Sequence, residues 1–187
     1  MKIKQRTIRF LARKEVEQII AHIKLEGTRN LRDRALITVL FSTGLRISEA
    51  LALDWTDFEE KVGTETMELP IIGKGGFQRT IYFSPEALRV VDEYIKARKD
   101  IFDEPLLFPI TVRCAQIMVQ KRADEAGLNK KVTPHMFGHS LATDLLKQGV
   151  DIRFVSEFLG HRSINNTMIY THVVSTQLKA IHKKLYK

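Results

Sequence analysis

Apolar residues recur at helical spacing along most of the chain. Residues 15–24 and 31–43 each place aliphatic side chains three or four positions apart, which predicts an amphipathic helix in each segment. Gly44 follows the second segment, where a glycine commonly ends a helix. The same spacing predicts helices at residues 48–53, 111–126, 152–159 and 174–185, a helix that opens at Ser84-Pro85, and one that is capped by Thr133-Pro134 and runs to about Gln148.

The pattern changes at residue 66. Residues 66–72 and 78–83 are rich in β-branched and aromatic side chains, which favours extended strands. The intervening Gly73-Lys74-Gly75-Gly76 is typical of a hairpin turn, and residues 106–108 are a candidate third short strand. The sequence therefore predicts a mainly α fold with a small antiparallel β-sheet, in the α+β class.

Composition narrows the class of protein. A chain of 187 residues suits one domain, or one domain with a small appendage, and its apolar content of 44% is ordinary for a globular core. No apolar run approaches the length of a transmembrane helix. Cys114 is the single cysteine, so an intrachain disulfide is excluded and a cytoplasmic location is expected.

Positive charge exceeds negative charge. The chain has 30 Lys and Arg against 22 Asp and Glu, for a net charge of +8. Such an excess favours a polyanionic partner, most often nucleic acid. Basic residues gather in residues 2–14 and 179–187. Solvated tails that keep the protein soluble are the alternative explanation of these two groups.

Two basic residues are candidates for chemistry on a phosphate. Arg46 lies just after Gly44, at a predicted helix junction, and a guanidinium grips two phosphate oxygens as a planar fork. Lys74 lies at the tip of the predicted hairpin, where a lysine can reach a substrate and donate a proton. Taken alone, Arg46 is equally consistent with an ordinary surface arginine, and a lone GKGG favours a solubilising turn lysine at residue 74.

His135 and His139 are four positions apart, so they are expected to share one helix face. A pair of histidines so placed can bind zinc, which makes a zinc hydrolase a competing hypothesis. The metalloprotease pattern HExxH, however, needs a glutamate where this chain has Met136, and no cysteine cluster supplies further ligands. The site is therefore expected to contain no metal.

Residues 159–172 (LGHRSINNTMIYTH) place His161 nine residues before Tyr170. A phenol with an ordinary pKa of about 10 is a poor nucleophile at neutral pH. A tyrosine that attacks a substrate therefore needs cationic or basic neighbours that stabilise the phenolate.

Four segments together resemble the catalytic domain of the tyrosine recombinases, the phage integrase and Xer-type family. They are residues 43–51 (TGLRISEAL), 73–76 (GKGG), 133–143 (TPHMFGHSLAT) and 159–172. Their order and spacing carry the resemblance, which covers the chain from about residue 7 to its end. It implies a recombinase catalytic-domain fold that cleaves and rejoins DNA through a 3′-phosphotyrosine.

The resemblance also implies roles for individual residues. Tyr170 would be the nucleophile, and Arg46 and His161 would bind the scissile phosphate. Lys74 would protonate the 5′ hydroxyl leaving group. His135 would support proton transfer or orient the phosphate, while His139 would be structural. Glu49, three residues after Arg46, would either brace that arginine or form an ion pair on the helix surface.

Gly138 departs from the family pattern, which has a second phosphate-binding arginine three residues after the first histidine. Losing one such contact typically lowers a rate by about 10²–10³-fold, so impaired activity is expected. A deliberate substitution or a natural loss would each explain the glycine, and Arg153 or Arg162 could compensate. The alternative function is a catalytically inactive DNA-binding or regulatory protein that keeps the fold.

The resemblance further implies partners and parts. The substrate would be double-stranded DNA, with no cofactor, and the protein would be monomeric when free and a homotetramer on paired DNA sites. We expect a basic arm at residues 1–14, a catalytic domain at 15–173, and a C-terminal helix at 174–187 that docks on a neighbouring protomer or contacts phosphates. Family members usually carry an additional N-terminal domain, so an excised or minimal catalytic domain with weaker DNA binding is expected.

Overall fold

The computed structural model describes residues 9–59, 66–73, 76–99, 103–160, 163–170 and 182–183. They form a mainly helical molecule with one two-stranded antiparallel sheet, which confirms the predicted α+β class. The helices are α1 (Arg13–His22), α2 (Thr28–Thr43), α3 (Ile47–Ala50), α4 (Pro85–Ala97), α5 (Val112–Glu125), α6 (Pro134–Lys147), α7 (Ile152–Phe158) and α8 (Asn165–Met168), with a 3₁₀ turn η1 (Trp55–Phe58).

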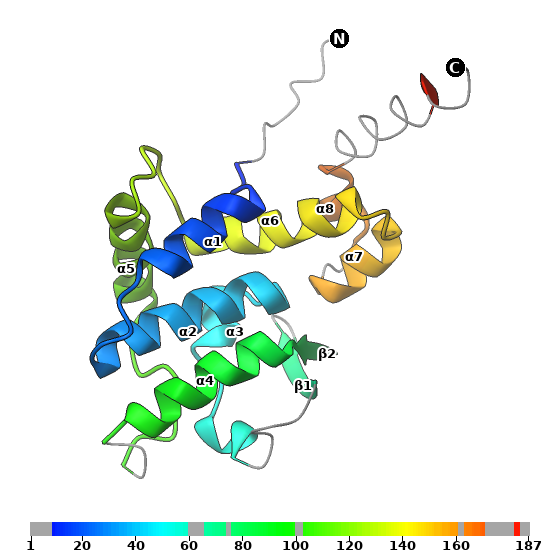
Figure 1. Cartoon of the computed structure of the whole chain (residues 1–187). Coiled ribbons are helices and arrows are strands. Elements are labelled where there is room, and N and C mark those ends of the chain that lie inside the picture. The colour runs from blue at the N-terminus through cyan, green and yellow to red at the C-terminus, as the bar shows by residue number, and fades with distance from the viewer. Residues whose placement is uncertain are drawn as a thin grey trace.

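Helix α2 is the centre of the molecule. It lies between α4 on one side and α1 and α6 on the other, as Figure 1 shows. Because it has neighbours on several sides, its residues from Ala35 to Phe41 are buried all round rather than along one stripe. The C-terminal end of α2 is thereby fixed beside α6. Candidate site residues from the two segments meet at this end of α2.

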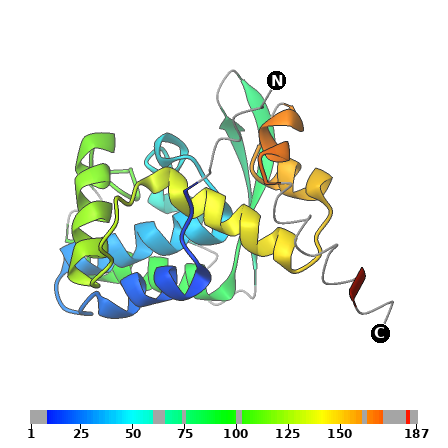
Figure 2. The ribbon, with the colours of Figure 1, turned by 90° about the horizontal axis from the view of Figure 1, so that it is seen from above.

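The sheet is the predicted hairpin. Strand β1 (Met67–Gly73) pairs with β2 (Phe77–Phe83) in a register that sets Met67 opposite Phe83 and Gly73 opposite Phe77. The backbone N–H of Gly76 donates to the carbonyl of Gly73 (3.1 Å), which closes the turn. Figure 2 shows the hairpin standing beside α7 and α8, and Tyr82 of β2 stacks on Phe158 of α7.

The predicted third strand at residues 106–108 is wrong. Leu106 makes only an isolated bridge with Asp54, and the N–H of Leu107 donates to the carbonyl of Leu53 (2.7 Å). Pro105 and Pro109 flank the segment and lack the N–H that a strand ladder requires, so the pairing cannot extend. Leu107 and Phe108 nevertheless enter the core, which explains their apolar character.

Helix ends follow the predicted chemistry with one exception. Gly44 ends α2 in a left-handed conformation (φ +65°), and Ser84 Oγ accepts from the N–H of Ala87 (3.3 Å) at the start of α4. Pro134 is the first residue of α6, as expected, but the Thr133 side chain makes no capping hydrogen bond. Thr133 is therefore the N-cap residue by its extended backbone, but its hydroxyl does not cap the helix.

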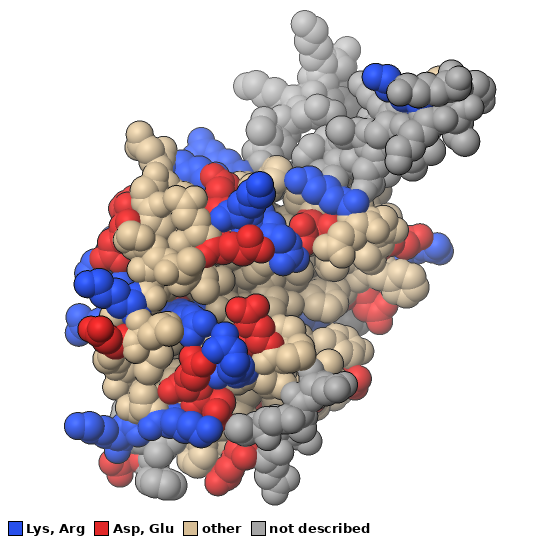
Figure 3. Space-filling view, viewed as in Figure 1, with Lys and Arg blue, Asp and Glu red and all other residues tan. Residues whose placement is uncertain are grey.

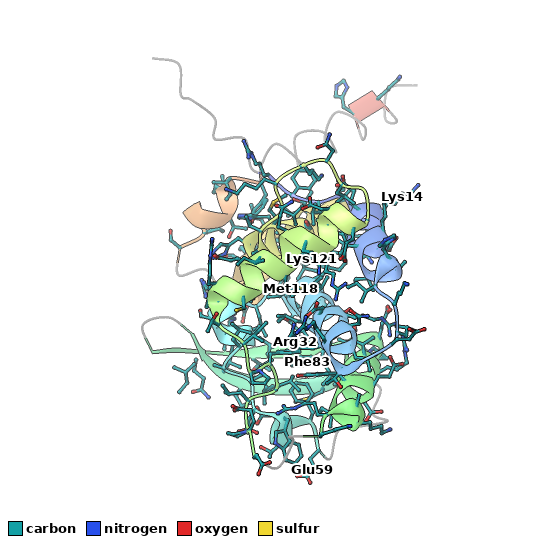
Figure 4. All side chains as sticks on the ribbon, turned by 90° about the vertical axis from the view of Figure 1, so that its left-hand side faces the viewer. Lys14, Arg32, Glu59, Phe83, Met118 and Lys121 are labelled. Carbon is teal, nitrogen blue, oxygen red and sulfur yellow. The ribbon has the colours of Figure 1, made fainter. Side chains whose placement is uncertain are left out.

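Apolar side chains fill the interior and charged ones cover the outside. In Figure 4, Phe83 of β2 and Met118 of α5 lie inside the molecule, whereas Lys14 and Glu59 lie at its edge. On the face shown in Figure 3, Lys and Arg are interspersed with Asp and Glu rather than gathered in one area. No helix in the part of the chain that the structure describes is long and apolar enough to cross a membrane.

Candidate active site

Residues from four separate segments line one small pocket of about 80 Å³. The turn after α2 contributes Gly44 and Arg46, and α6 contributes three residues. Leu159 comes from the end of α7, and Tyr170 lies two residues after the end of α8. The α6 residues are His135, Gly138 and His139. Predicted residues that are more than a hundred positions apart are thus brought together.

Gly44 permits this close approach. A Cβ at this position would lie 2.8 Å from Leu159 Cδ2 and 3.2 Å from Leu141 Cδ2, and the positive φ already disfavours any other residue. The absence of a side chain therefore lets the end of α2 contact both α6 and α7. That contact places Arg46, two residues later, at the rim of the pocket.

Arg46 is the N-cap residue of α3 and has an extended backbone. Nη1 donates to Glu49 Oε1 (2.9 Å), and Nη2 donates to the carbonyl of Gly160 (3.1 Å). One third of the side chain stays exposed, so the guanidinium is oriented without being enclosed. This is the geometry expected of a fixed cation that can meet an anion from solvent.

Glu49 holds a second arginine as well, which the sequence did not indicate. Arg79 of β2 donates to both Glu49 oxygens (3.0 and 2.8 Å), and the side chains of Arg79 and Glu49 are only 6% and 9% exposed. Glu49 therefore braces Arg46 from a buried position and is not in a surface ion pair. Burial opposes ionisation of Glu49, but hydrogen bonds from Arg79 and the Arg46 backbone outweigh it and lower the pKa of its carboxyl.

Tyr170 is buried, with 1% of its surface exposed, and its hydroxyl hydrogen-bonds Nδ1 of His139. The two rings lie 5.7 Å apart between centroids and are tilted by 54°. Burial raises the pKa of the Tyr170 hydroxyl above its ordinary value of 10.0. The tyrosine is therefore protonated at neutral pH in the free protein.

The two histidines share one face of α6, as their spacing predicted, but differ in surroundings. His135 is exposed in the first turn, whereas His139 is half-buried one turn later. Burial, and secondly the charge of His135, lower the pKa of His139 from 6.5. The sequence assigned His139 a structural role, yet this histidine contacts Tyr170.

Gly138 is half-buried and has space for a Cβ. Outside its own helix, a Cβ built on it would meet the carbonyl oxygen of Gly44, at an ordinary contact distance of 3.7 Å, and no other atom of the described residues within 4 Å. Since residue 138 lines the same pocket as Arg46 and Tyr170, a longer side chain there would extend toward the cluster. The backbone at residue 138 thus accepts a Cβ without a close contact, at the position where the resemblance expected an arginine.

Several predicted residues fall elsewhere. Lys74 and His161 lie outside the described residues, as does Arg162, although Gly73 and Gly160, the residues before the first two, are described. Arg153 is 78% exposed and pairs with Asp151, so it does not line the pocket. Among the described residues, no group of three or more His, Cys, Asp or Glu side chains could hold a metal ion.

Comparison with known proteins identifies the family. The sequence profile of the phage integrase family matches residues 9–177. The chain belongs to the phage integrase family. This integrase-family chain is 33% identical to tyrosine recombinase XerC of Pediococcus pentosaceus over 95% of its own length and 62% of the relative. It is 37% identical to tyrosine recombinase XerD of Corynebacterium glutamicum over 87% of its length and 55% of the relative.

Solved structures agree with this membership. The XerH site-specific recombinase, bound to palindromic difH substrate in a post-cleavage complex, superposes with a TM-score of 0.77 at 27% identity, covering 95% of this chain and 53% of that one. The catalytic domain of bacteriophage HP1 integrase shares the fold at 22% identity, with a TM-score of 0.63 and 94% of each chain covered. The integrase-family chain thus spans about three fifths of the curated relatives it matches.

Proposed function

We propose that this chain is the catalytic domain of a site-specific tyrosine recombinase that cleaves and rejoins double-stranded DNA. The observation that carries the proposal is the shared pocket, where a braced arginine, two histidines and a tyrosine meet. Its membership in the integrase family and the names of its recombinase relatives support the same chemistry.

In the proposed reaction, the Tyr170 oxygen attacks the scissile phosphorus and displaces the 5′ oxygen of the next nucleotide. A 3′-phosphotyrosyl bond forms, and the 5′ hydroxyl leaves with a proton from Lys74. Arg46, His135 and His161 stabilise the charge that develops on the nonbridging oxygens. Attack by a 5′ hydroxyl on the phosphotyrosine reverses these steps, so the bond energy is conserved and no cofactor is consumed.

The proposal extends to the assembly. Residues 1–14 would form a basic arm on DNA, residues 15–173 the catalytic domain, and residues 174–187 a helix that docks on a neighbouring protomer. The protein would be monomeric when free and tetrameric on two paired sites. It would act in the cytoplasm, where its DNA substrate would lie.

A catalytically inactive DNA-binding protein is the second candidate, and Gly138 is the observation that favours it. Without a cation at this position, the pocket of the described residues offers one arginine where the family pattern has two. Binding would survive this loss, because affinity for duplex DNA is the sum of many phosphate contacts.

Covalent capture on DNA separates the two candidates. The chain is incubated with a library of nicked suicide duplexes of randomised sequence, and protein–DNA adducts that survive SDS are isolated and sequenced. A recombinase gives an adduct at a recurring sequence, slowly for the natural chain and faster for Gly138→Arg, and Tyr170→Phe abolishes it in both backgrounds. Sequence-selective binding without any adduct, even for Gly138→Arg, would instead establish the inactive binder.

A further inference from the structure

The contact between Tyr170 and His139 has no role in the reaction described above. The hydroxyl of Tyr170 meets Nδ1 of His139, while His135 lies one helical turn away on the same face. The histidine that touches the nucleophilic oxygen is therefore not the one that the family pattern makes catalytic.

Position alone makes His139 a candidate for proton transfer. Only 1% of the surface of Tyr170 is exposed, so contact between its side chain and bulk water is small. Burial also raises the pKa of that hydroxyl, which makes spontaneous ionisation rarer than for a free tyrosine. A tyrosine in this setting needs a base already in contact with its oxygen.

His139 is in the protonation state that a base requires. Its half-buried ring lies in a pocket whose other titratable or charged described residues are Arg46, His135 and Tyr170. Burial and the nearby His135 lower the pKa of His139 below 6.5. The imidazole is therefore neutral at pH 7 and retains one nitrogen that accepts a proton.

The surrounding helix keeps His139 in place. The next residue, Ser140, is buried, and its hydroxyl donates to the carbonyl of Met136 (2.6 Å). The same oxygen accepts from the N–H of Leu11 (2.8 Å), which fixes the chain before α1 against α6. A base on such an anchored helix needs little reorganisation before it acts.

We propose that His139 is the general base that accepts the phenolic proton of Tyr170 during attack on DNA. The Tyr170 oxygen–phosphorus bond forms, the phosphorus–5′ oxygen bond breaks, and the phenolic proton moves to His139 Nδ1. The leaving 5′ oxygen takes a separate proton from Lys74. In the reverse step the imidazolium returns its proton to the phenolate as the tyrosine is released. This assignment rests on the proposed recombinase function.

The test is cleavage by His139→Gln, with His135→Gln as the matched control on the same helix face. Glutamine can hydrogen-bond Tyr170 but cannot accept a proton as a base, so His139→Gln is expected to slow adduct formation by about 10²-fold or more. Each variant is then made with 3,5-difluorotyrosine at position 170, whose phenol is more acidic. Fluorination is expected to restore about tenfold or more of the rate lost in His139→Gln and little of that lost in His135→Gln.

A second substrate separates the two ends of the reaction. A duplex with a bridging 5′-phosphorothiolate has a leaving group that needs no proton, so it should rescue Lys74→Ala and leave His139→Gln slow. Rescue of His139→Gln by this sulfur would overturn the assignment to the nucleophile. Cleavage by His139→Gln at the natural rate would overturn it as well, while the recombinase function would stand because adducts still form.

Nitrogen-15 NMR tests the base without requiring catalysis. The proposal expects neutral His139 to carry its proton on Nε2, with Nδ1 free to accept from Tyr170. A proton on Nδ1 in the neutral ring, donated toward Tyr170, would contradict the proposal even if cleavage is never observed. Absence of adducts in every background, Gly138→Arg included, would overturn the recombinase function and this assignment together.

Discussion

At the scale of the single residue, Gly138 lines the pocket at the position where the resemblance expected a second arginine. The position is in the middle of α6, where glycine costs about 0.5–1 kcal/mol relative to alanine, so helix formation gives no reason for it. Among the described residues outside its own helix, a Cβ there meets the Gly44 carbonyl, at 3.7 Å. The backbone therefore accepts a Cβ at this position, which lines the same pocket as Arg46.

We expect Gly138→Arg to accelerate adduct formation by about 10²–10³-fold, since a second guanidinium would stabilise charge on the attacked phosphate. Single-turnover cleavage of the captured duplex measures the change. Gly138→Gln is the control, because it gains helix propensity and length without charge. An equal acceleration by glutamine would show that helix stability, and not the missing cation, limits the natural chain.

The residues of the site differ in how far sequence could predict them. Arg46, His135 and Tyr170 were predicted because they lie in recognisable segments, and the structure places all three at one pocket. The contact of Tyr170 with His139 was missed. Helical spacing puts both histidines on one face but leaves open which turn meets the tyrosine, and that depends on how α7 and α8 pack against α6.

At the scale of elements, Glu49 of α3 links this helix to β2 and, through Arg46, to the end of α7. It accepts hydrogen bonds from Arg46 and from Arg79 of β2, while Arg46 also donates to the carbonyl of Gly160 after α7. Gly160 packs closely against this cluster, since a Cβ on it would lie 2.7 Å from the Arg79 guanidinium. Its φ of +64° also favours glycine at this position. The buried carboxylate thus joins the two arginines in one ionic cluster, which reaches the pocket through Arg46.

Glu49→Gln is expected to destabilise the fold by about 3 kcal/mol, because it leaves the buried Arg79 without its counter-charge. Urea unfolding at pH 7 measures the loss. Folding lowers the pKa of Glu49 below its ordinary 4.5, so its stabilisation is complete above that pH and is lost as the pH falls through the lower folded value. The difference between natural and variant chains should therefore shrink below pH 4.5.

The exposed pair of Glu86 and Arg89 on α4 provides the control for this prediction. Their closest atoms are 3.9 Å apart, and both side chains are more than half exposed. Glu86→Gln removes the same charge but should change stability by less than about 0.5 kcal/mol at any pH, because solvent screens the pair. A similar loss in both variants would show that net charge, not the buried cluster, is responsible.

Elements were predicted well where the signal is local. Helices α2, α4 and α6 follow from apolar spacing and end residues, and the hairpin follows from its glycines. Helix α8 was missed because four residues carry no periodic pattern. The pairing of Glu49 with Arg79, 30 residues away, was also unpredictable, because it arises only when the hairpin packs beside α3.

For the whole molecule, the positive excess lies mostly outside the described residues. On the face shown in Figure 3, basic side chains are interspersed with acidic ones. Many of the described basic residues are in ion pairs, as Lys96 is with Asp92 (2.7 Å). The segments outside the described residues contain the basic residues Lys2, Lys4, Arg6, Lys61, Lys74, Arg162, Lys179, Lys184 and Lys187, against the acidic residues Glu60, Glu65 and Asp100. Long-range attraction to DNA is therefore expected to come chiefly from these segments.

Replacing Lys2, Lys4 and Arg6 with glutamine tests this expectation on the Tyr170→Phe background, in which binding is free of cleavage. If each contacts a phosphate, the slope of log K against log salt should become shallower by up to about 0.9 per residue, as released counterions decrease. Replacing Arg89, Lys96 and Lys99 removes the same charge from α4 and the residues just after it, across α2 from α1 (Figure 1). Fluorescence titrations over a salt series should show a shallower slope only for the first triple variant. An equally shallower slope in both triple variants would mean that net charge alone steers binding. A slope unchanged from that of the parent chain in both would identify residues 1–14 as a solvated tail.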